Sequence, residues 1–160
     1  MTWRQAFFKQ AGDDYSMFVH LNQVSSAECR QLHYLQMATE KLAKAFLCGP
    51  DNIPPKITHI ALTKFLKVAK SRPDLRRQLG YETKRAAFVS YIDGLIPFAK
   101  KIENLAPEGI DKPNPEYPWK ARTGEIIAPV DFKYNDILDR QLEMNKLNKL
   151  VSNLFRIGIT

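Results

Sequence analysis

The sequence predicts an all-α fold: an antiparallel bundle of about five or six helices, with a long proline-rich loop before the last one. Apolar residues recur at helical spacing along most of the chain. Proline and glycine separate these segments, and only Gly124 to Phe132 (GEIIAPVDF) offers a strand candidate. With 160 residues, 44% of them hydrophobic, the chain can bury one core. We therefore expect a single helical domain over residues 1–160.

The expected helices follow from where the apolar spacing starts and stops. In chain order they cover Trp3 to Ala11 and Asp14 to Leu21 (one interrupted helix or two), a long run after Ser25-Ser26 to about Leu47, Thr58 to Ser71, Pro73 to Leu79, about Thr83 to Asn104, and about Tyr134 to Phe155.

Local signals set the boundaries of the first half. Ser25 and Glu28 have the spacing of a capping box, in which hydroxyl and carboxylate satisfy the first backbone donors of a helix. Gly49-Pro50 should end that helix. The stretch from Asp51 to Lys56 (DNIPPK) should be a loop, because adjacent prolines do not fit a helix interior.

The second half shows the same logic. Pro73 can begin a helix and Gly80 can end one. In the last helix, Ile137 and Met144 lie seven residues apart on one face. We expect a core that includes Leu35, Leu42, Phe65, Ile92, Ile96 and Leu147.

The positive charge is concentrated in the middle of the chain. The net charge is +7, and the segment from Lys56 to Lys101 alone carries +8. Such a segment attracts RNA, DNA or an acidic protein surface. The alternative is a solvated helix face without a partner. If it binds, the candidate ligand-binding residues are Lys64, Lys67, Lys70, Arg76, Arg77, Lys84 and Arg85.

Several classes of protein are disfavoured. No apolar run is long enough to cross a membrane, and the first residues do not read as a secretory signal. Cys29 and Cys48 fit free thiols in a reducing cytoplasm, a disulfide between them being the alternative. There is no glycine-rich phosphate loop and no metal-ligand spacing around the histidines, so we expect no cofactor and no metal.

The long helix carries the most distinctive motif. Tyr34 to Ala45 reads YLQMATEKLAKA, in which an aromatic-apolar pair is followed by Gln36, small residues, Glu40-Lys41 and Lys44-Ala45. This stretch resembles the signature helix of HEPN domains, which are small helical bundles. Asp13 to Leu21 resembles the first helix of that family, and Thr58-His59 with the following apolar residues resembles its third. Within the motif, Glu40 and Lys44 form an i, i+4 pair that ordinarily contributes a few tenths of a kcal/mol.

The resemblance implies two branches of function. The catalytic branch of HEPN proteins cleaves RNA without metal, using an arginine and a histidine four to six residues apart on a late helix. Here the three histidines, His20, His33 and His59, all lie in the first 59 residues. We therefore predict no catalytic residue of that type. A ribonuclease with an atypical site that uses His33, Arg30 or a basic residue of the middle segment is the alternative.

The proline-rich stretch from Lys112 to Pro129 carries two large aromatic residues, Tyr117 and Trp119. Long loops in compact domains are uncommon unless they have a function. One interpretation is a lid whose rings stack on a base or ligand. The other is a strap whose aromatic residues cover the open end of the core.

Taken together, the sequence predicts a cytoplasmic, non-catalytic HEPN-like binding module for a nucleotide or RNA. The resemblance implies a homodimer and a nucleotidyltransferase partner encoded beside it. An adaptor for an acidic protein is the third possibility.

Overall fold

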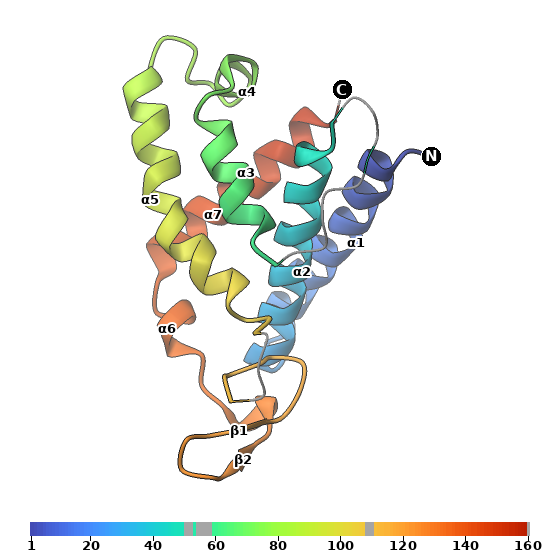
Figure 1. Cartoon of the computed structure of the whole chain (residues 1–160), viewed down its shortest axis with the longest axis vertical. Coiled ribbons are helices and arrows are strands. Elements are labelled where there is room, and N and C mark those ends of the chain that lie inside the picture. The colour runs from blue at the N-terminus through green and yellow to red at the C-terminus, as the bar shows by residue number, and fades with distance from the viewer. Residues whose placement is uncertain (50–52, 54–58, 108–110, 160) are drawn as a thin grey trace.

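The computed structural model describes residues 1–49, 53, 59–107 and 111–159. It confirms the all-α class, with a small two-stranded sheet as the exception (Figure 1). The elements are α1 (Trp3–Gln23), α2 (Glu28–Leu47), α3 (Ala61–Ala69), α4 (Pro73–Gln78), α5 (Arg85–Glu103), β1 (Trp119–Lys120), β2 (Ile126–Ile127), a 3-10 turn (Pro129–Asp131), α6 (Asn135–Leu138) and α7 (Gln141–Ile157).

Helices α1 and α2 form an antiparallel hairpin along one side of the bundle (Figure 1). Thr2 caps α1: its hydroxyl accepts the backbone N–H of Gln5 at 3.2 Å, and the Gln5 side chain accepts the N–H of Thr2 at 2.9 Å. The helix then continues without interruption through both predicted segments. A partly buried ion pair of 2.6 Å between Lys41 and Asp14 joins the two helices.

The predicted capping box of α2 is wrong. The residue before the first helical turn is Ala27, which makes no side-chain capping bond, and Ser25 has a positive φ of 49°. The Glu28 carboxylate instead accepts the backbone N–H of Tyr134 at 3.2 Å. The Glu28 carboxylate, which the sequence pattern assigned to capping the start of α2, therefore binds the backbone of a segment far away in the sequence.

Helices α3, α4 and α5 begin and end close to their predicted limits, although part of the predicted start of α3 lies outside the described residues. Pro73 opens α4, and Gly80, with a φ of +82°, lies in the turn that follows it. Pro97 lies inside α5. In Figure 1, α3 runs beside α2 and α5 beside α3, so the middle of the chain forms the second side of the bundle.

The final segment differs from the single helix predicted from the sequence. The chain leaves the helix at Asp139 and Arg140, and α6 and α7 are separate. Helix α7 then packs against α1, where the Phe155 ring lies 5.3 Å from Phe8 and 5.6 Å from Tyr15. The strand candidate is correct only for Ile126–Ile127, which pairs with β1 in an antiparallel hairpin.

The core has the expected composition. Leu35, Leu42, Phe65, Ile92 and Leu147 are at most 2% exposed, whereas Ile96 is only partly buried and packs at the core edge. Cys29 and Cys48 are buried free thiols, so the alternative of a disulfide between them is wrong. Among the described parts of the chain, no helix combines the length and apolar character that a membrane crossing requires.

Candidate functional site

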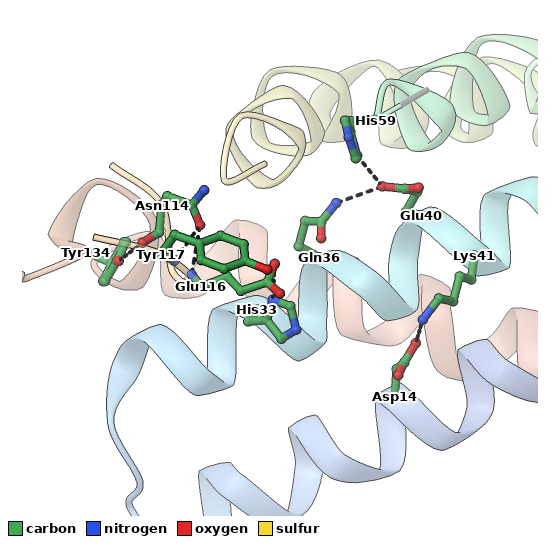
Figure 2. A network of polar contacts seen from close by, with 10 residues as sticks. All are labelled: Asp14, His33, Gln36, Glu40, Lys41, His59, Asn114, Glu116, Tyr117 and Tyr134. Atoms are coloured by element: carbon green, nitrogen blue, oxygen red, sulfur yellow. Dashed lines mark hydrogen bonds and ion pairs between the residues drawn. The ribbon is translucent and has the colours of Figure 1, made fainter. Parts of the chain in front are cut away.

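A buried carboxylate in the middle of α2 organises the most polar part of the interior. Glu40 is 9% exposed and accepts hydrogen bonds from three side chains. Gln36 donates to Oε2 at 2.8 Å, Lys44 donates to Oε1, and Nδ1 of His59 lies 2.9 Å from Oε2. Figure 2 shows Gln36 and His59 meeting at this carboxylate. The Glu40 carboxylate therefore links α2 to the turn that precedes α3.

Helical geometry explains the arrangement on α2. Gln36, Glu40 and Lys44 are four residues apart, so they share one helix face. That face is covered by neighbouring helices, and both Gln36 and Lys44 are also buried. The ammonium group of Lys44 lies 5.9 Å from the ring centroid of Phe7 on α1. A buried lysine in this position needs its carboxylate partner.

The environment keeps Glu40 ionised. Burial by itself would raise the pKa of Glu40, but hydrogen bonds from Lys44 and His59, together with the charges of these groups, outweigh it and lower the pKa below its ordinary value. Because Glu40 is a carboxylate with only acceptor atoms, Nδ1 of His59 must carry the proton in their hydrogen bond.

A second buried carboxylate lies at the end of α5. Glu103 accepts the backbone N–H of Thr63 at 2.8 Å and also the Thr63 hydroxyl, so it supplies an acceptor for the first turn of α3. Burial raises the pKa of Glu103 despite these hydrogen bonds, and the negative charge of Glu40 adds to the effect.

His59 and Glu103 line a cavity of about 940 Å³. Its walls come from the start of α3, the end of α5, the proline-rich stretch, and the chain around α6. The charged and aromatic lining residues are His59, Lys101, Glu103, Lys112, Phe132, Lys133, Tyr134 and Asp136. Lys101 is 2.9 Å from Asp136, and Lys133 is 3.3 Å from Glu28.

The proline-rich stretch is fixed to the bundle by its own contacts. The Asn114 side-chain oxygen accepts the backbone N–H groups of Glu116 at 2.8 Å and Tyr117 at 3.2 Å. The Tyr134 hydroxyl donates to the Asn114 carbonyl at 3.2 Å, and burial raises the pKa of this phenol (Figure 2). Trp119 is 4% exposed and meets the Phe132 ring edge-on at 5.0 Å.

The two aromatic residues of this stretch therefore have different surroundings. Trp119 covers the interior as the strap interpretation expects, so its ring is not open to a ligand. Tyr117 is 61% exposed, and in Figure 2 its ring lies beside Glu116 and His33. His33 of α2 lies 3.9 Å from Glu116, which ties the stretch to the hairpin of α1 and α2.

The predicted basic residues lie apart from this cavity, on α3, α4 and the start of α5. Lys64, Lys67, Lys84 and Arg85 are exposed, and within the described ranges none of them forms an ion pair. The others are more constrained. Lys70 is half-buried and bound to Asp93 at 2.8 Å, Arg77 is 3.3 Å from Glu82, and Arg76 is half-buried. Lys56, which the segment charge included, lies outside the described residues.

The sequence alone did not identify His59, Glu40 and Glu103 as a group. They come from α2, the turn before α3 and the end of α5, and are 19 or more residues apart, so no local spacing joins them. His59 had a signal only through its place in the HEPN-like pattern. Among the described residues, no group of three His, Cys, Asp or Glu could hold a metal ion.

Comparisons of the chain with protein-family models, with curated proteins and with solved structures found no match.

Proposed function

We propose that the chain is a non-catalytic, HEPN-like binding module that holds a nucleotide, free or at the end of an RNA strand, in the cavity between α3, α5 and α6. The observation that carries the proposal is the convergence of Lys101, Lys112 and Lys133 on one cavity that also contains the Phe132 ring. Lysine is a common ligand of phosphate groups, and an aromatic ring suits a base.

Size and composition support the same ligand class. A volume of about 940 Å³ lies within the ordinary range of small-molecule sites. The three lysines come from three separate segments, so folding is needed to bring their charges together. The cavity lining contains two acidic groups. Asp136 forms an ion pair with Lys101, and both carboxylate oxygens of Glu103 accept hydrogen bonds from Thr63.

Binding of AMP, followed by NMR, tests the proposal. We expect shifts at residues that line the cavity and a loss of about tenfold in affinity for Lys101→Ala or Lys133→Ala, because each removes a charge-assisted contact to phosphate. Lys149→Ala on α7 is the matched control, and its affinity should stay unchanged. The absence of cavity shifts with AMP, GMP, CMP and UMP would contradict a nucleotide site.

The exposed basic residues of α3 and α5 support a second function, the binding of an RNA backbone. Lys64 and Lys67 lie one turn apart on α3, Lys84 precedes α5 and Arg85 is its first residue, and all four are exposed. Replacing Lys64 and Lys67 by glutamate should weaken RNA binding and reduce its salt dependence. Lys70 is left in place because it is half-buried and bound to Asp93. The fold should change little, since exposed charges contribute little to stability. The same change at Lys146 and Lys149 is the control. An equal loss of RNA affinity in the control would show that α3 does not carry a dedicated RNA-binding surface.

The HEPN resemblance further supports a homodimer and a nucleotidyltransferase partner as parts of this proposal. Two alternatives give different results in the RNA experiment. An atypical ribonuclease at Arg30 or His33 would cleave the RNA, and His33→Ala would stop the cleavage. An adaptor for an acidic protein would bind an acidic polypeptide as tightly as RNA at equal charge.

A further inference from the structure

We propose that His59 is the anion-binding side chain of the cavity, that it binds an anion with uptake of one proton, and that Glu40 positions it for this task. The inference deepens the proposed function and rests on it in one respect, namely that the cavity is the ligand site. It assigns the group that contacts a phosphate or other oxyanion and the condition under which it does so.

The first step is the direction of the hydrogen bond between His59 and Glu40. Nδ1 of His59 is 2.9 Å from a carboxylate oxygen, so Nδ1 is the donor. In the neutral imidazole, Nε2 is then a bare acceptor. In the protonated imidazole, Nε2 carries a hydrogen and becomes a cationic donor. One proton therefore converts the free edge of the ring from a group that repels an oxyanion into one that binds it.

The second step is that Glu40 is rigidly held. Its Oε2 also accepts from Gln36 at 2.8 Å, and its Oε1 accepts from Lys44. The carboxylate is buried, so water does not compete for these positions. An acceptor fixed in this way fixes both the tautomer and the orientation of the imidazole, as a carboxylate does for a histidine in other functional sites.

The third step is access. The side chain of His59 is 51% exposed although its Nδ1 edge is bonded to a buried group, and the residue lines the cavity. No hydrogen bond to Nε2 is present among the described residues. The Nδ1 edge of the imidazole is therefore held by a buried group, while the Nε2 edge is open to a ligand. A histidine with a purely structural role in the core would have both edges enclosed.

The surrounding charges determine which group responds to pH. From α2, His59 faces Glu40 and Lys44; from α5, Glu103 and Lys101 border the same space. Lys112, Lys133 and Asp136 complete the charged lining. Asp136 is paired with Lys101, and both oxygens of Glu103, whose pKa burial raises, accept hydrogen bonds from Thr63. Within this lining, His59 is the histidine, the residue type whose charge ordinarily changes between about pH 5 and pH 8.

Sulfate is the probe for the test, because it keeps its double negative charge across this pH range and its own protonation does not interfere. We expect sulfate to bind the wild-type protein about tenfold more tightly near pH 5.5 than near pH 8, as one proton coupled to binding requires. Calorimetry in buffers of different ionisation enthalpy should show proton uptake at intermediate pH, where the imidazole is largely neutral in the free protein and charged in the complex. His59→Gln should bind with a pH-independent affinity equal to the weaker wild-type value.

A second variant examines the positioning role. Glu40→Gln replaces the carboxylate by an amide that can either accept from or donate to Nδ1. ¹⁵N spectra of the imidazole should then show a mixture of neutral tautomers, and the pH dependence of sulfate binding should shrink. His33→Gln is the matched control, because His33 lies 3.9 Å from the exposed Glu116 and outside the cavity. It should bind sulfate as the wild type does.

The outcomes separate this inference from the proposed function. Sulfate binding with the same pH dependence in wild type and His59→Gln would overturn the inference, as would a neutral wild-type His59 protonated at Nε2. If nucleotides bind in the cavity and sulfate affinity is insensitive to His59, only the inference fails. If sulfate binds as expected and no nucleotide does, the anion site stands and the nucleotide function fails.

Discussion

Replacing Glu40 with alanine is expected to lower the free energy of unfolding by about 3–5 kcal/mol, the range found when one partner of a buried ion pair is removed. The substitution leaves the Lys44 ammonium, in a side chain only 8% exposed, without its carboxylate. It also removes the acceptor of Gln36, whose buried amide then lacks its partner. Urea denaturation at neutral pH measures the change.

The loss should depend on pH in a defined direction. The folded state lowers the pKa of Glu40 from 4.5, so the stabilisation is present above pH 4.5 and disappears as the pH falls through the folded-state value. Wild type and Glu40→Ala should therefore approach each other in acid. A difference that grows on acidification would mean that the carboxylate is not the stabilising form.

Two comparisons show whether the buried charge is the cause. Glu143→Ala removes the carboxylate of a surface pair with Arg140, and we expect a loss below about 1 kcal/mol. A double variant, Glu40→Leu with Lys44→Met, removes both charges and keeps the volume, and it should recover much of the stability. An equal loss for Glu40→Ala and Glu143→Ala would show that the buried pair has no special weight.

This prediction also marks the limit of what the sequence conveyed. From the sequence, Glu40 and Lys44 formed an ordinary helix pair of a few tenths of a kcal/mol. The spacing of the pair was predicted correctly. The size of its contribution to the free energy of unfolding depends on burial, which the packing of neighbouring helices determines. Thr39, one of the small residues of the motif, is 2% exposed, and its hydroxyl donates to the Leu35 carbonyl at 2.9 Å. Local geometry was predictable where the helix itself supplied both partners.

Features that join distant segments were not predictable in this way. Glu28 fitted a capping box with Ser25, but the folded chain places the Tyr134 backbone within reach of its carboxylate. The approach of His59 to Glu40 has the same character, since the contact depends on how α3 enters the bundle. Trp119 is a further example. The sequence left open whether its stretch is a lid or a strap, and the edge-to-face contact between Trp119 and Phe132 is known only from the folded structure. Each of these outcomes is set by tertiary packing, which no spacing of a few residues encodes.

Leu42→Ala is the second large effect, with an expected loss of about 2–5 kcal/mol in the free energy of unfolding. Leu42 is 2% exposed and belongs to the main core cluster, on the face of α2 that the helical spacing assigned to the interior. Truncation removes its buried apolar surface and leaves a cavity that the surrounding side chains fill only in part. Chemical denaturation of the two proteins under identical conditions gives the difference directly.

The chain offers a matched control for this substitution in Leu142, a leucine near the start of α7 that is 64% exposed. Leu142→Ala removes the same atoms from a position without a surrounding core, so its effect should stay within about 0.5 kcal/mol. The contrast between the two leucines isolates burial from helix propensity, because both lie in helices and both become alanine. Equal losses at the two positions, or an unchanged stability for Leu42→Ala, would mean that α2 does not present this face to the core. In that case the buried positions of Gln36, Glu40 and Lys44 on the same helix, and the site built on them, would have to be reassigned.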